Sequence, residues 1–218
     1  EFIRISIFMN VFDCHVNRVP SSGKIILNDL AGGSGRLDVL CRAVNSSLFL
    51  SHGIRNDSII VLHLLGGDGP PRRISFDGSS LKGVRVEERA IAGHIAKIIA
   101  EPVPPMGQWQ TVSPGIKYSG GNLQETVSEW SKEGIELYTL NANSERLWED
   151  DSLVENTDQE YSKMGFFLSD DLDFTEEELQ ILSSETHMRS VGDLWIQGHL
   201  AIAAVHQILD MGIGINRP

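Results

Sequence analysis

The stretch SGRLDVLCRAVNSSLFLSHGIRND, residues 34–57, decides how the first half of this chain folds. Its apolar side chains recur at the three- and four-residue spacing that gives a helix one apolar face, and Ser34 is placed to cap that helix. The apolar run 48–50 predicts a short buried strand that ends where polarity returns at Ser51. We therefore expect a helix, a strand and a loop, in that order.

The loop after this strand carries His52, Arg55 and Asp57. In α/β proteins, ligands gather where loops leave the carboxyl ends of strands, so an arginine and an aspartate two positions apart could bind and orient an anion. The alternative is a surface loop with a local ion pair between Arg55 and Asp57, because exposed pairs of this kind are common. The spacing alone leaves both interpretations open.

Outward from this stretch, apolar strands alternate with amphipathic helices. Strands are predicted at 2–8, 58–65, 72–76, 135–140, 165–168 and 186–191, and helices at 87–100, 122–132, 176–183 (capped by Thr175) and 194–211. Prolines make 101–113 a predicted linker or loop, and 143–163 is an acidic excursion. This alternation predicts an open, mostly parallel α/β sheet with helices on both faces.

The net charge of −12 is unevenly distributed along the chain. Residues 1–100 contain 12 Lys plus Arg against 9 Asp plus Glu, or +3, whereas residues 101–218 contain 6 against 21, or −15. This asymmetry favours an anionic partner for the first half. The acidity itself fits either a salt-rich cytosol, where about 1 M salt shortens the Debye length to about 3 Å, or ordinary solubility.

The composition makes a membrane or metal-cluster protein a poor expectation. The two cysteines, Cys14 and Cys41, are too few for a disulfide framework, and His199 and His206 are seven positions apart, which is a poor chelating spacing. No run approaches the ~18 uninterrupted apolar residues of a membrane helix. We expect a soluble cytoplasmic protein with no metal and no membrane contact.

The two blocks SGRLDVLCR and FLSHGIRND resemble the signature of the archaeal tRNA (pseudouridine(54)-N1)-methyltransferase family, part of the knotted SPOUT class. Shorter matching blocks follow in the same order at 70–71, 87–92, 113–116, 138–141 and 206–210. The resemblance implies methylation of N1 of a pseudouridine in the tRNA T-loop, with S-adenosylmethionine as cofactor. It also implies one SPOUT domain over 1–218, with an RNA-recognition half (1–113) and a cofactor-binding half (114–218) that carries a C-terminal trefoil knot, and a homodimer.

The resemblance further implies which residues bind each ligand. The cofactor is expected on three loops and the helix that follows them, at Leu140, Ser169, Ser190, Val191, Gly192, Asp193, Leu194 and Ala201. RNA is expected at Arg36, Arg42, His52 and Arg55.

Methyl transfer needs positioning and exclusion of water more than covalent chemistry, so no catalytic triad is required. The catalytic roles go to Arg55, which could hold a phosphate or a base carbonyl, and to Asp57, which could accept the N1 proton.

Two other functions stay open at this point. The first is pseudouridine N1-methylation of ribosomal RNA with the same fold and cofactor. The second is a non-catalytic RNA-binding SPOUT homologue. The residues that favour it are Ser169, where the family usually has a glycine, and Ala201, where it often has a cysteine.

Overall fold

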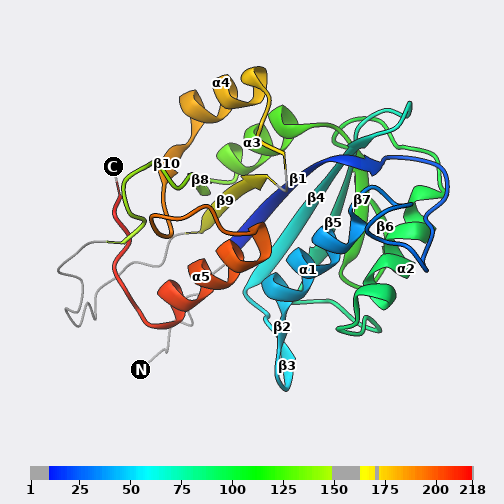
Figure 1. Ribbon diagram of the computed structural model, residues 1–218, viewed down its shortest axis with the longest axis horizontal. Helices are drawn as coiled ribbons and strands as arrows, with labels where there is room; N and C mark the ends of the chain where they lie inside the picture. The colour runs from blue at the N-terminus through cyan, green and yellow to red at the C-terminus, as the bar shows by residue number, and fades with distance from the viewer. Residues whose placement is uncertain (1–9, 149–162, 170–171, 218) are drawn as a thin grey trace.

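The computed structural model describes residues 10–148, 163–169 and 172–217, which form one mixed sheet with helices on both faces (Figure 1). Across the sheet the strands follow the order β10 (His187–Arg189), β8 (Glu136–Leu140), β9 (Met164–Ser169), β1 (Asn10–Pro20), β4 (Ser58–Gly66), β5 (Arg72–Asp77), β7 (Ile116–Gly120) and β6 (Gln110–Ser113). Neighbouring strands from β10 to β4 run parallel, and those from β4 to β6 run antiparallel. The predicted α/β sheet is confirmed, and an antiparallel extension is added to it.

The sheet is centred on β1 and β4, which pair in parallel. β4 is buried along most of its length, as its continuous apolar run predicts for a strand covered on both faces. Side chains of β1 alternate between the faces, so Phe12 and Cys14 pack on one side while Val11 packs on the other. By the same alternation, Asp13 and His15 share the face of Val11.

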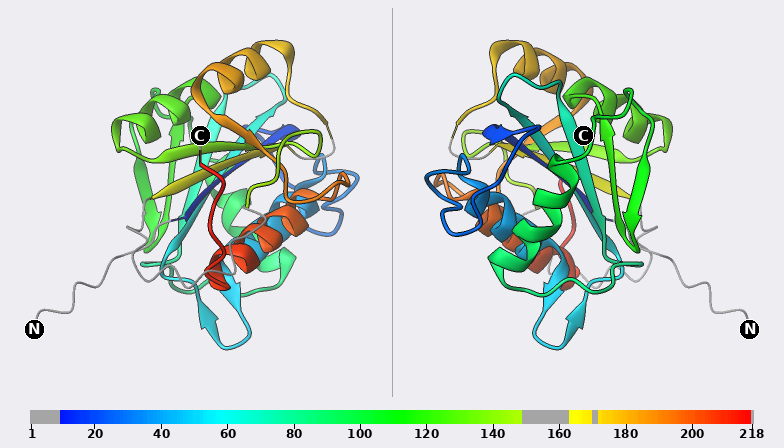
Figure 2. Two further views of the ribbon diagram at one scale, coloured as in Figure 1. Left: turned by 90° about the vertical axis from the view of Figure 1, so that its left-hand side faces the viewer. Right: turned by 90° about the vertical axis from the view of Figure 1, so that its right-hand side faces the viewer.

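Five helices in the described ranges cover the sheet, as Figure 2 shows from two sides. One face carries α1 (Leu37–Leu48), α2 (Glu88–Ile99) and α5 (Gly198–Asp210), and the other carries α3 (Leu123–Lys132) and α4 (Glu176–Glu185). No helix among the described residues combines the length and the apolar character needed to span a bilayer.

Helices α3 and α4 each begin with a capping box. Asn122 and Glu125 form a capping box at α3, and Thr175 and Glu178 form one at α4. Each box satisfies backbone N–H groups that have no partner inside the helix. The predicted cap at Thr175 is confirmed.

The start of α1 differs from the prediction. The Ser34 hydroxyl does not cap the helix but bonds the backbone of Ile26, accepting from its N–H at 2.8 Å. Arg36 occupies the N-cap position in a left-handed conformation, with φ of 69°, and no side chain caps the helix. Ser34 therefore anchors the preceding loop to the start of α1.

The predicted strand at 48–50 is not part of the main sheet. It forms β2 (Phe49–Leu50), which pairs with β3 (Gly53–Ile54) in a separate antiparallel hairpin. His52 lies in the turn of this hairpin, exposed to solvent. The expected loop at the carboxyl end of a parallel strand was therefore wrong, because a two-residue turn folds the strand back before it reaches the sheet.

Other boundaries also changed. The predicted strand 2–8 and most of the acidic excursion lie outside the described residues, and β1 occupies a segment for which no strand was predicted. The predicted loop 101–113 contains edge strand β6, which pairs with the unpredicted β7. The last helix begins at Gly198 rather than at 194, so residues 194–197 form a loop.

Candidate functional site

A cleft opens where β8 and β9 end, beside the first turn of α5. Parallel strands end at the same edge of a sheet, so the loops that follow them converge there. The cleft is lined by Leu140, Asn141, Ala142, Leu168, Ser169, Asp173, Val191, Gly192, Leu194, Trp195, Ile196, Gly198 and Ala201. Three segments far apart in the chain thus build one concave surface.

Six of the eight residues expected at the cofactor line this cleft: Leu140, Ser169, Val191, Gly192, Leu194 and Ala201. The other two do not. Ser190 is buried, and its hydroxyl accepts the Gly192 N–H at 3.0 Å and donates to the Gly192 carbonyl, which shapes the loop. Asp193 points to solvent near Arg146, at 3.8 Å.

Several lining residues were not expected from the sequence. Most of them lie within two positions of an expected residue, so widening each predicted segment by a few positions would have included them. Asp173 brings a carboxylate to a lining whose other side chains are mostly apolar. Gly198 allows α5 to start close to β9, because a Cβ there would lie 2.8 Å from Leu168 Cδ1.

Backbone hydrogen bonds hold the cleft loops together. Ser190 N–H donates to Glu145 O at 2.7 Å, and Leu147 N–H donates to Ser190 O at 2.8 Å. The C-terminal tail joins them, because Asn216 N–H donates to Leu147 O at 2.7 Å. The loops after β8 and β10 are therefore fixed to each other and to the end of the chain.

Arg55 lies away from this cleft and forms an ion pair. Its Nη1 donates to Asp210 Oδ1 at 2.9 Å and its Nη2 donates to Asp210 Oδ2, so the contact is bidentate. The hydrogen bond from Arg55 lowers the pKa of the Asp210 carboxyl, against the raising effect of partial burial. Arg55 thus pairs with a residue 155 positions away rather than with Asp57, whose carbonyl oxygen accepts the Asn10 N–H at 2.8 Å.

Arg36 and Arg42 both contact Asp38 at the start of α1. Arg36 Nε donates to Asp38 Oδ1 at 3.1 Å, and Arg42 Nη2 donates to Asp38 Oδ2 at 2.7 Å. Burial raises the pKa of Asp38, but the two guanidinium groups outweigh it and leave that pKa below its usual value. Two cationic side chains are therefore held on an ionised carboxylate.

The four residues expected at RNA lie at opposite ends of one helix layer. Arg42 is close enough to His199, in the first turn of α5, to lower its pKa together with burial, so Arg36 and Arg42 lie at the cleft end. The β2–β3 hairpin, which carries His52 and leads to Arg55, projects beyond the other end of α1 and α5 (Figure 1). α5 has 13 residues, or about 20 Å, so one chain does not bring all four residues together.

Comparison with known proteins places these features in a family. Residues 9–212 match the family model described as SAM-dependent RNA methyltransferase. A tRNA (pseudouridine(54)-N(1))-methyltransferase from Methanococcus maripaludis is 36% identical over 205 residues, which cover 93% of this chain and 98% of that protein. The enzyme of the same name from Methanocaldococcus jannaschii is 34% identical over 207 residues, covering 93% and 97%.

A solved structure has the same fold. The crystal structure of Archaeoglobus fulgidus Nep1 bound to S-adenosylhomocysteine aligns with a TM-score of 0.58, over 94% of this chain and 96% of that one. The sequence identity is 15%, so this likeness concerns the fold alone.

Proposed function

Because the chain belongs to the family of SAM-dependent RNA methyltransferases, we infer that it transfers a methyl group from S-adenosylmethionine to N1 of pseudouridine 54 in tRNA. The observation that carries this inference is the length of the similarity. Relatives named for this reaction are 32–36% identical over 93% of the chain, so the match includes both the cleft loops and the stretch 34–57.

The cleft suits S-adenosylmethionine by its chemistry. Leu140, Val191 and Ala201 offer apolar surface to a purine ring, and Asp173 offers a carboxylate to ribose hydroxyls or to a cationic ligand. Ser169 lines the cleft, so the serine in place of a glycine stays in contact with the space where a ligand would lie. We propose that the six predicted lining residues hold the cofactor, with Ser190 shaping their loop.

When bound, S-adenosylmethionine supplies a methyl group already activated by its sulfonium. The protein has to place the acceptor in line, exclude water and remove the N1 proton. Arg36 and Arg42, at the cleft end of α1, provide positive charge for RNA phosphates. Asp57 and Arg55 lie near the other end of α5, so they can serve a cleft only if a second chain brings them to it.

We propose that a homodimer does this. A strip of exposed apolar side chains follows the cleft loop and α5: Leu194 (76% exposed), Trp195 (64%), Ile196 (41%), Leu200 (48%) and Met211 (60%). In a two-fold dimer, the strip of one chain packs against the same strip of its partner. An antiparallel crossing of the two α5 helices would bring Arg55 and Asp57 of one chain to the cleft of the other.

We also propose that the second half, 114–218, holds the cofactor and carries the trefoil knot of the SPOUT class, while 1–113 recognises RNA. All the cleft residues come from the second half. The tail after α5 returns to the loop after β8, where Ile215 pairs with Trp148. Both observations support this division.

The reaction can be tested on RNA of defined modification. The purified protein, S-adenosylmethionine and a tRNA carrying pseudouridine 54 should yield N1-methylpseudouridine, detected by nucleoside mass spectrometry. The matched control is the same tRNA with uridine at position 54, which should stay unmethylated because its N1 is bonded to the ribose. A ribosomal hairpin with pseudouridine tests the alternative substrate, and methylation of that hairpin alone would contradict the inference.

The cleft can be tested separately by calorimetry with S-adenosylhomocysteine. Ala201→Phe should abolish binding, because the larger side chain would fill the space that Ala201 lines. Ala203→Phe is the control, since Ala203 is exposed on the same helix and does not line the cleft. Equal affinities of the two variants would mean that the cofactor binds elsewhere.

A further inference from the structure

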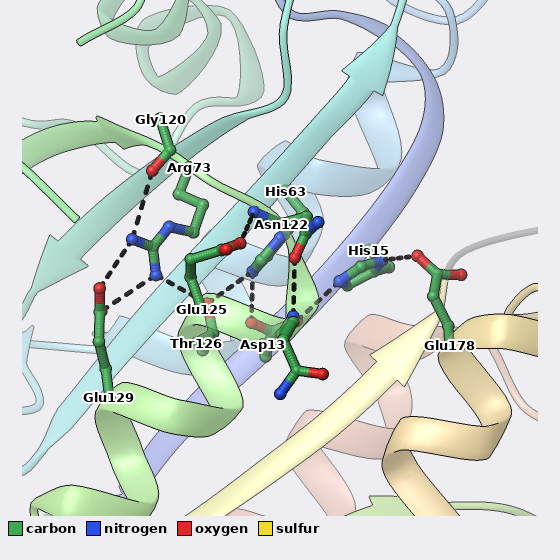
Figure 3. Close-up of polar contacts among 11 residues, drawn as sticks. Asp13, His15, His63, Arg73, Gly120, Asn122, Glu125, Thr126, Glu129 and Glu178 are labelled. Atoms are coloured by element: carbon green, nitrogen blue, oxygen red, sulfur yellow. Dashed lines mark hydrogen bonds and ion pairs between the residues drawn. The ribbon is translucent and has the colours of Figure 1, made fainter. Parts of the chain in front are cut away.

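The sheet face covered by α3 and α4 contains a buried polar cluster that the proposed function does not use (Figure 3). Asp13 and His15 lie on β1 and His63 lies on β4, and all three are completely buried. His15 and His63 are direct partners in the strand register, and Asp13 lies two positions before His15 on the same face. The sheet itself brings these side chains together.

The metal-binding atoms of the three side chains converge. His63 Nε2 lies 2.6 Å from Asp13 Oδ2, and His15 Nε2 lies 3.5 Å from Asp13 Oδ1. The two imidazole rings stack with centroids 4.3 Å apart. One ligand atom from each residue can be chosen so that all three lie within 4.8 Å of one another.

Hydrogen bonding accounts for only part of this arrangement. Both Asp13 oxygens, His15 Nε2 and His63 Nδ1 are buried without a partner in hydrogen-bond geometry, although the ion-pair distances above are short. Around them lie apolar side chains such as Val11, Val61 and Phe167. Buried polar atoms left in this state are costly, and a cation between them would satisfy them.

Neighbouring side chains orient the two histidines, as the groups around a metal site usually do. His15 Nδ1, the nitrogen turned away from Asp13, lies 3.1 Å from Glu178 Oε1. A carboxylate on the outer nitrogen is the usual support of a metal-binding histidine, because it fixes the ring and its tautomer. Thr126 Oγ1 lies 3.1 Å from His63 Nε2 and supplies a further oxygen.

The charges around the cluster are mixed. Arg73 on β5 faces the cluster and, after burial, is the main group that lowers the pKa of His63, but it is paired with Glu129 at 2.8 and 3.0 Å and with Thr126 at 3.1 Å. The carboxylates of Glu178, Glu125 and Glu129 oppose the effect of Arg73 on His63.

We propose that Asp13, His15 and His63 bind one divalent transition-metal ion, with Zn²⁺ as the first candidate, which fastens β1 to β4. Two imidazoles and a carboxylate are donors that Zn²⁺ accepts, and bonds of about 2.0–2.1 Å set tetrahedral ligand atoms about 3.3–3.4 Å apart. The His63–Asp13 contact, at 2.6 Å, has to open by less than about 1 Å, and ligand atoms that lie farther apart, up to 4.8 Å, have to close to this spacing. Because the site is fully buried, its role is structural.

The experiment uses the full chain, stripped with a chelator and titrated with Zn²⁺ in a metal-buffered solution that keeps weak surface sites empty. We expect one Zn²⁺ per chain, a higher melting temperature with Zn²⁺, and X-ray absorption from two imidazoles and oxygen at about 2.0–2.1 Å. Co²⁺ in place of Zn²⁺ should give visible bands of a low-coordinate site.

His63→Gln removes one ligand and should lower Zn²⁺ affinity at least 100-fold. The matched control is His199→Gln, which removes a histidine outside the cluster and should leave binding unchanged. If His63→Gln does not fold, the stoichiometry and absorption spectrum of the wild-type protein decide. Absence of one-to-one Zn²⁺ binding, a spectrum without histidine ligands, or full binding by a folded His63→Gln variant would overturn the proposal.

Discussion

At the scale of single residues, the Arg55 guanidinium can pair either with Asp210 or with an RNA phosphate. In the folded chain its guanidinium holds Asp210, with 13% of the Arg55 side chain and 48% of the Asp210 side chain exposed. RNA phosphate would compete with this carboxylate for the same bidentate fork. The Arg55–Asp210 pair can therefore act as a resting partner that RNA displaces.

Three variants of this pair separate an RNA-binding role from a structural one. Arg55→Ala should lose about 1.5–3 kcal/mol of tRNA affinity if Arg55 contacts RNA, and Arg55→Lys should recover only part of the loss. Asp210→Asn breaks the same ion pair but leaves the guanidinium available, so it should bind tRNA at least as tightly as the wild type. Filter binding and urea unfolding on each variant measure both effects. Equal tRNA affinity of Arg55→Ala and wild type, with reduced stability, would leave Arg55 a structural role alone.

His206 should make stability depend on pH. Burial lowers the pKa of this ring to about 4, helped by Arg55, while its contact with the Ser47 carbonyl at 3.0 Å opposes the shift. The unfolded chain, with a histidine pKa near 6.5, binds the proton more readily between pH 6.5 and pH 4. The free energy of unfolding should therefore fall as pH falls through this window, by at most about 3 kcal/mol from this group.

The variant His206→Gln isolates this contribution. Glutamine can still donate to the Ser47 carbonyl but does not titrate. Urea unfolding at pH 7 and pH 4.5 should show a smaller loss of stability in the variant than in the wild type. The same loss in both proteins would assign the acid sensitivity to other groups.

At the scale of elements, one side chain of α4 links the capping box at the start of the helix to the buried cluster of Asp13, His15 and His63. Thr175 N–H donates to Glu178 Oε2 at 2.9 Å, and Glu178 Oε1 reaches His15. One side chain thus closes the capping box and orients a buried imidazole. α4 has only one fully buried residue, Leu182, so its position depends strongly on such polar contacts.

Thr175→Ala should lower the free energy of unfolding by about 1 kcal/mol, because a helix N–H group loses its partner. Ser184→Ala on the same helix is the control and should change stability by less than about 0.5 kcal/mol, since Ser184 donates only to the Ile181 carbonyl on an exposed face. Chemical denaturation of the two variants tests the difference. Equal losses would show that the capping box contributes nothing specific.

At the scale of the whole molecule, the exposed apolar strip along α5 is the surface that most needs a partner. Leu200→Glu places a charge in the strip and should convert a dimer into a monomer, as measured by sedimentation at micromolar concentration in high salt. Val112→Glu is the matched control, because Val112 is equally exposed (46%) on edge strand β6, away from the strip. A monomeric wild-type protein under these conditions would contradict the proposed assembly, and with it the delivery of Arg55 to a partner's cleft.

Several elements could be predicted from the sequence alone because their signals are local. The apolar run of β4, the period of α2 and the caps of α3 and α4 act within a few residues, so each could be predicted without knowing the rest of the fold. The cleft loops were predicted through the family resemblance, and the parallel strands bring six of their residues together because such strands end at one edge.

Contacts between residues far apart in the chain could not be predicted in this way, because they depend on how the elements are arranged in the folded protein. The two-residue turn between β2 and β3 keeps the segment that leads to Arg55 out of the main sheet. Arg55 pairs instead with Asp210 at the end of α5. Strand register set His15 opposite His63, although 48 positions separate them and no strand was predicted at β1. Contacts of this kind depend on register and on chain crossovers. Local periodicity does not specify either of them, because the same pattern of apolar residues is compatible with many pairings.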